Sequence, residues 1–61
     1  MSDLAKLIMY EMGWDLNKTK IWFRTPNPLL GGMSPEWYEV VKGRDRLEKF
    51  INEEIDGNNK R

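Results

Sequence analysis

The segment that most constrains this fold spans residues 22–43, where a Pro-Asn-Pro run and a Gly-Gly pair separate aromatic-rich stretches. Asn27 precedes Pro28, and a residue before proline is pushed out of the helical region, so we expect extended or turn geometry there. Gly31 and Gly32 add backbone freedom that no other residue type provides. So many turn signals predict a fixed connection between two helices.

A helix start is predicted directly after the glycines. Ser34 suits the N-cap position, and Pro35 suits the first helical position, where its missing N–H is not needed. We expect the helix over about 35–42, with Gly43 as its end. Its core-facing side would carry Trp37, Val40 and Val41, with Tyr38 and Glu39 turned away from it.

Three further helices are predicted from apolar residues at helical spacing. They cover about 3–12, 17–24 and 45–56, with Asp45 as the cap of the last helix and Gly57 as its stop. Nothing reads as a strand, so we expect an all-α fold, a small bundle of three to four short helices. The expected core consists of Trp22, Leu30, Val40, Leu47, Phe50 and Ile51.

The length of 61 residues allows a single small domain. We divide it into an N-terminal helix with its connection (1–16), the helices and loop that follow, and a flexible polar tail (57–61). A chain of this size buries only about 60% of its unfolded surface, and it has no cysteine for a disulfide. The expected sources of extra stability are burial of aromatic residues, association as a homodimer, and binding of a partner.

The charge balance limits the classes of partner that the chain can bind. Ten basic and ten acidic residues give a formal net charge of zero. No basic stripe of sequence neighbours is present, which argues against nucleic-acid binding by this chain alone. No apolar run approaches the roughly 20 residues of a membrane span, and no signal peptide is visible. We therefore expect a soluble, cytoplasmic protein.

The residue types argue against catalysis. The chain has neither His nor Cys, so the commonest general base and the thiol nucleophile are both missing. Ser34 is better explained as a helix cap. Glu53, Glu54 and Asp56 form an acidic cluster, but adjacent helical residues splay about 100° apart and no spaced ligand loop accompanies them. We expect no enzyme, no cofactor and no metal site.

The aromatic residues and one methionine are the candidates for partner contacts. Trp22 is expected in the core, whereas the sequence leaves Trp37 between a core and an interface role. Tyr38 lies off the apolar stripe and is the leading candidate for an exposed contact, since Tyr and Trp are enriched at interfaces. Met33 suits equally an adaptable partner contact or a plug over the helix end.

The ordered residues of the connection resemble the toxin-binding domain of Xre/MbcA/ParS-like antitoxins. That family has a tryptophan on one helix, an Asn-containing loop, Leu-Gly-Gly, and a Ser/Thr-Pro that opens the next helix. The matching residues are Trp22, Asn27, Leu30, Gly31, Gly32, Ser34 and Pro35. The match extends to about residue 55 and departs from the family at two places. Most members carry an N-terminal helix-turn-helix domain, whereas this chain has room for only one helix there. The positions after Pro35 are usually aliphatic in the family, whereas this chain has Trp37 and Tyr38.

The resemblance implies a protein–protein interaction. Such domains neutralise a RES-fold toxin, which consumes NAD, by covering its active site. The C-terminal segment of the antitoxin commonly approaches that site, so Lys60 and Arg61 become candidate contacts. The chain would then be a minimal antitoxin, a fragment of a longer one, or a phage or mobile-element mimic.

Two alternatives remain open, namely a structural subunit of a larger assembly and a small nucleic-acid-binding regulator. The regulator would use a surface assembled in three dimensions from Lys18, Lys20, Arg24, Arg44 and Arg46.

Overall fold

The computed structural model describes residues 3–59. Within this range the chain forms four α-helices and one 3-10 turn, without a strand. The elements are α1 (Asp3–Met12), α2 (Leu16–Arg24), η1 (Pro28–Leu30), α3 (Pro35–Lys42) and α4 (Arg44–Asn59). The predicted all-α bundle of three to four short helices is confirmed.

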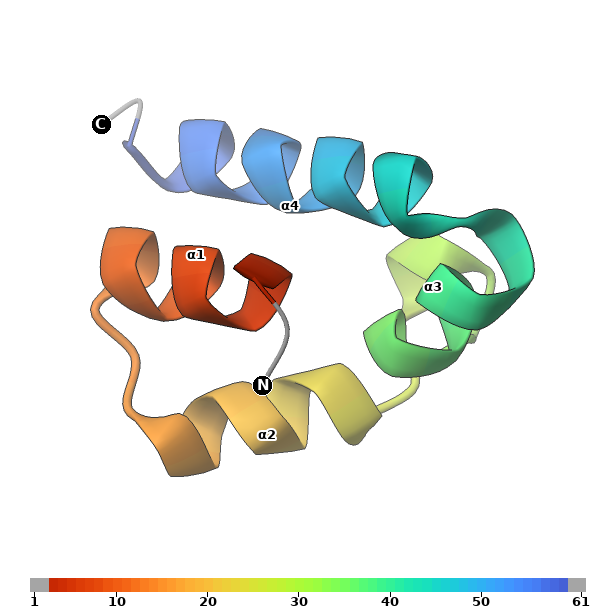
Figure 1. Ribbon diagram of the computed structural model, residues 1–61, viewed down its shortest axis with the longest axis horizontal. Coiled ribbons are helices and arrows are strands. Elements are labelled where there is room, and N and C mark those ends of the chain that lie inside the picture. Colours follow the sequence, from red (N-terminus) through yellow and green to blue (C-terminus); the bar gives the residue numbers. More distant parts are fainter. Residues whose placement is uncertain (1–2, 60–61) are drawn as a thin grey trace.

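The helices form a small bundle with α1 at its centre. α1 lies between α2 and α4, and the long α4 runs beside it (Figure 1). α3 closes one end of the molecule, where it packs against both α2 and α4. Because α3 meets its neighbours on one side only, its other side faces outward.

The core forms where α1, α2 and α4 meet. Its buried residues are Leu4, Ala5, Ile8, Phe23, Leu47, Ile51 and Ile55. Spacings of four residues in α1 and α4 place most of them on one face of each helix. Of the predicted core, Leu30, Leu47 and Ile51 are confirmed as buried. Trp22 and Phe50 are half-buried and pack against the cluster from its edge.

The turn from α1 to α2 is held by a capping residue. Gly13 ends the first helix at φ +70°, and the Asp15 carboxylate accepts the Lys18 N–H at 2.7 Å. The buried Thr19 hydroxyl donates to the Asp15 carbonyl oxygen at 2.8 Å. The polar group that α2 buries therefore has a partner, and its burial carries little penalty.

The loop from α2 to α3 is organised around Asn27. Its side-chain oxygen accepts the Leu29 N–H at 2.9 Å, and its N–H donates to the Met33 carbonyl oxygen at 3.0 Å. Its own carbonyl oxygen accepts two further loop N–H groups at 2.9 and 3.0 Å. Every backbone N–H of residues 27–33 thus donates within the same segment. The predicted fixed connection is a closed hydrogen-bonded unit.

A single glycine joins α3 to α4. Gly43 has φ +101° and ψ +155°, donates its N–H to the Glu39 carbonyl oxygen at 3.0 Å, and accepts the Leu47 N–H at 3.3 Å. It therefore ends one helix, as predicted, and carries the first carbonyl of the next. Two predictions about α4 are wrong. Asp45 is not its cap, because the helix already begins at Arg44, and Gly57 lies inside it, not at its end.

Candidate functional site

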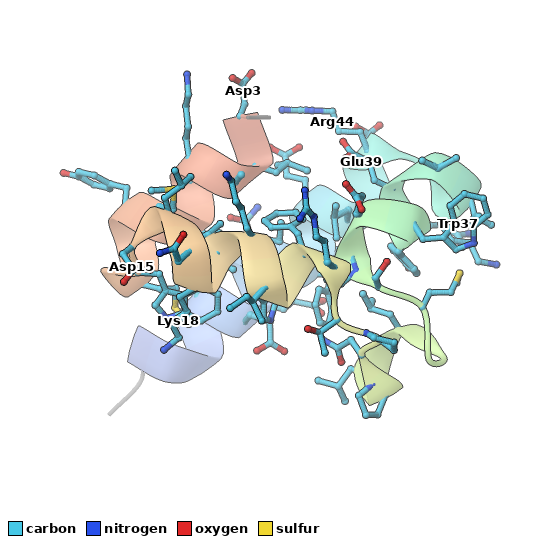
Figure 2. The ribbon with its side chains drawn as sticks, turned by 90° about the horizontal axis from the view of Figure 1, so that it is seen from below. Asp3, Asp15, Lys18, Trp37, Glu39 and Arg44 are labelled. Carbon is cyan, nitrogen blue, oxygen red and sulfur yellow. The ribbon has the colours of Figure 1, made fainter. Side chains whose placement is uncertain are left out.

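α3 turns an apolar stripe outward. Trp37 is 56% exposed, Val40 70% and Val41 50%, and Figure 2 shows Trp37 at the edge of the molecule. The more buried side of the helix holds Pro35, Tyr38 and Glu39. The predicted orientation of this helix is wrong, and so is the placement of Val40 in the core.

The reason lies in how α3 is tethered. At its start, the Trp37 N–H donates to the Ser34 hydroxyl at 3.2 Å, and the helix follows directly from the closed loop. At its end, Gly43 leads into α4 without a linker. An eight-residue helix fixed at both ends takes the rotation that its turns impose, even where its most apolar side then faces water.

The other predicted partner contacts differ from Trp37 in their exposure. Tyr38 is half-buried and packs against the core, so it is less exposed than predicted, and its role as a partner contact stays a prediction. Met33 is half-buried as well, which leaves its two predicted roles untested. Lys60 and Arg61 lie outside the described residues.

Four further aromatic rings contact one another. Trp22 packs edge-on against Phe23 with ring centroids 5.0 Å apart, and stacks on Phe50 of α4 at 6.3 Å and 14°. Trp14 meets Trp22 edge-on at 5.9 Å, and the Lys18 ammonium lies 4.9 Å from the Trp14 ring centre. The stack of Trp22 on Phe50 joins α2 to α4. Trp22 is predicted in the core and lies half-buried at its edge.

The basic residues of the nucleic-acid alternative do not form one surface. Lys18, Lys20 and Arg24 belong to α2, while Arg44 and Arg46 belong to α4 on the other side of α1. Figure 2 shows Lys18 at the lower left and Arg44 at the upper side of the molecule, away from each other. Arg44 is also engaged with two carboxylates, at 4.0 Å from Asp3 and 3.7 Å from Glu48.

A shallow groove lies where α4 meets η1 and α3. Its volume is about 390 Å³. Its lining residues are Leu29, Leu30, Tyr38, Arg46, Lys49, Phe50 and Glu53. The sequence analysis did not bring these residues together, although the i, i+3, i+4, i+7 spacing of the α4 members was a usable signal.

The motif residues build the connection. Asn27 and Ser34 are the caps of η1 and α3, and Pro35 is buried at the first position of α3. Gly31 and Gly32 have φ of +68° and +87°, where side chains other than glycine are strained. These caps and glycines shape the path of the chain into α3.

The remaining candidates of the sequence analysis are Ser34 and the acidic residues. The Ser34 hydroxyl oxygen accepts the Trp37 N–H and so caps α3. Across residues 3–59, no three acidic side chains come together as a metal site. In the same part of the chain, no helix is both long and apolar enough to cross a membrane.

No family model, curated protein or solved structure matches this chain. A functional assignment therefore rests on the residues and the geometry described above.

Proposed function

We propose that this chain is a protein–protein recognition module of the antitoxin toxin-binding type, which neutralises a RES-fold, NAD-consuming toxin by covering its active site. The observation that carries the proposal is the outward apolar stripe of α3, which includes a tryptophan that is 56% exposed. Tryptophan is enriched among the residues that dominate binding energy at interfaces.

The stripe is held in place before any partner arrives. Ser34 caps the start of α3 and Gly43 caps its end, while the closed loop fixes the approach of the chain. A prearranged contact helix loses little conformational entropy on binding, which favours affinity. The resemblance supports the proposal in the same way, because its motif residues build this loop.

Trp37 is expected to be the main contact. Trp37 is 56% exposed, so replacing it with Ala removes a partly buried ring and should lower folding stability by no more than about 2 kcal/mol. Loss of a central interface tryptophan typically costs about 2 kcal/mol or more of binding free energy, which corresponds to roughly a thirtyfold loss of affinity. Tyr10 on α1 is 86% exposed and offers a matched control for removal of an exposed aromatic ring.

The test is affinity capture of the tagged chain from its native host, followed by reconstitution. We expect one stoichiometric RES-fold toxin, whose NAD consumption stops when the chain is added. Trp37→Ala should lose capture and inhibition, and Tyr10→Ala should retain both. Recovery of no RES-fold toxin, or equal inhibition by both variants, would refute the proposal.

The C-terminal residues have their own test. If Lys60 and Arg61 contact the toxin, deletion of these two residues weakens toxin binding and leaves helical content unchanged. An unchanged affinity would remove them from the interface without affecting the role of α3.

A further inference from the structure

Four residues of α4 form one wall of the groove. They are Arg46, Lys49, Phe50 and Glu53. Their i, i+3, i+4, i+7 spacing places them on a single face of the helix, next to the face that enters the core. The wall therefore presents one aromatic ring among three charged groups, in a fixed order along the helix axis.

Two leucines and one tyrosine complete the lining of the groove, whose exposed surface is mainly polar. Leu29 is 72% exposed in η1. Leu30 is buried beside it, and the half-buried Tyr38 completes the lining from α3. A ligand side chain that lies over Leu29 and Phe50 would remove apolar surface from water on both walls.

The charges of the groove are available to a ligand. The ion pairs of the described residues are formed by Arg44, which contacts Asp3 and Glu48. Arg46 and Lys49 stand one turn apart on the groove face, and no carboxylate within residues 3–57 lies within 4.0 Å of either side chain. Both are thus free to receive a carboxylate, and an arginine can do so with two parallel hydrogen bonds.

We propose that this groove binds a peptide segment of the protein partner in which an apolar side chain stands next to Asp or Glu. The apolar side chain packs on Leu29 and Phe50, and the carboxylate pairs with Arg46 and Lys49. This inference rests on the proposed function for the partner being a protein. A phosphate backbone fits less well, because two cations give it little affinity.

The groove adjoins the stripe of α3. Tyr38 lines the groove, and Val41 lies three residues after Tyr38 and four after Trp37, so it borders both on the helix surface. One partner can therefore cover the stripe and insert a segment into the groove. The acidic residue of that segment selects the partner by charge, and the stripe adds apolar contact area.

The test is an NMR titration of the full chain, labelled with 15N, with three short capped peptides. The first is Glu-Asp-Leu-Phe-Glu, the second replaces its apolar residues with Ser, and the third replaces its acidic residues with Lys. We expect only the first peptide to shift the amides of the groove residues. Equal shifts with the basic peptide, no shifts with any, or shifts on another surface would overturn the proposal.

Charge-reversed variants test the electrostatic part. Arg46→Glu with Lys49→Glu should weaken binding of the first peptide by about tenfold or more. Lys18→Glu with Lys20→Glu makes the same charge change on α2 and should leave binding unaltered. An equal loss of peptide affinity in both variants would show that only net charge matters and would refute the proposal. If the groove amides shift with protein concentration in the absence of peptide, the groove binds a second copy of the chain instead. If a single-stranded oligonucleotide reproduces the shifts, the groove binds nucleic acid instead.

The captured partner separates this inference from the proposed function. If it binds the Arg46/Lys49 variant as tightly as the parent chain while Trp37→Ala loses it, the groove inference fails and the function stands. If the first peptide binds in the groove but no RES-fold toxin is recovered, the groove stands and the toxin assignment fails.

Discussion

The one-residue corner at Gly43 makes a sharp prediction about stability. Its backbone lies at φ +101° and ψ +155°, a region occupied almost only by glycine. A Cβ added at this position would meet no atom within 4 Å. The Gly43→Ala substitution therefore causes no clash, and its effect reports the backbone conformation alone.

The magnitude follows from two opposing terms. Holding a residue with a side chain in this region costs about 1–3 kcal/mol. Replacing glycine also lowers the entropy of the unfolded chain, which returns about 0.4–1 kcal/mol to the folded state. We expect a net loss of about 1–2 kcal/mol, which in a domain of this size lowers Tm by roughly 5–15 °C.

Gly57 provides the matched control. It lies within α4, its φ is not positive, and a Cβ there would also meet no atom within 4 Å. The same substitution, Gly57→Ala, should therefore stabilise the helix by about 0.5 kcal/mol. The two variants differ in backbone conformation and not in available space.

The assay is urea denaturation followed by circular dichroism at 222 nm, with the parent chain and both variants measured together. A change in midpoint at constant slope reports stability. If Gly43→Ala stays within about 0.3 kcal/mol of the parent, the strain argument is wrong. If Gly57→Ala destabilises, α4 does not continue through this position as described.

Four further predictions can be checked in the same preparation. Ser34→Ala removes the acceptor of the Trp37 N–H and should cost about 1 kcal/mol in denaturation, with Ser34→Asp close to the parent. Arg44→Met breaks two exposed ion pairs and should change stability by less than about 1 kcal/mol, with any loss vanishing at high salt. Iodide should quench Trp37 most strongly, since Trp22 is packed among rings, so Trp37→Phe removes the most accessible fluorescence. The expected homodimer predicts a Tm that rises with protein concentration over about a hundredfold range, and a constant Tm would indicate a monomer.

Local signals in the sequence predicted the elements well. The first helix has the predicted bounds of 3–12, and Ser34, Pro35 and Gly43 have the predicted places around α3. Each of these features depends on residues a few positions apart. Capping, proline geometry and glycine conformation are local physics, and they can be predicted from neighbours in the chain.

The orientation of α3 could not be predicted in this way. Periodicity identified Trp37, Val40 and Val41 as one stripe, which is correct, and assumed that the most apolar side faces the core, which is wrong. Which side faces inward depends on two turns and on where α2 and α4 lie. The groove could not be predicted from the sequence either, because its lining comes from η1, α3 and α4, which are separate parts of the chain.

Gly57 shows a different limit. Glycine in a helix interior costs only about 1 kcal/mol, so the residue type marks a helix end only where the backbone turns to positive φ. Gly43 does so and Gly57 does not, yet the two look alike in the sequence. Distinguishing them requires the packing of α4, which places Ile55 in the core just before Gly57.

The closed loop around Asn27 has a consequence for portability. Its hydrogen bonds join residues at most six apart and take no donor or acceptor from the helices beside it. Such a unit can form early, since short-range contacts are made before distant ones. Residues 27–33 should also keep their conformation when they are transplanted between two unrelated helices. Slow amide hydrogen exchange in this segment would show that its hydrogen bonds have formed there.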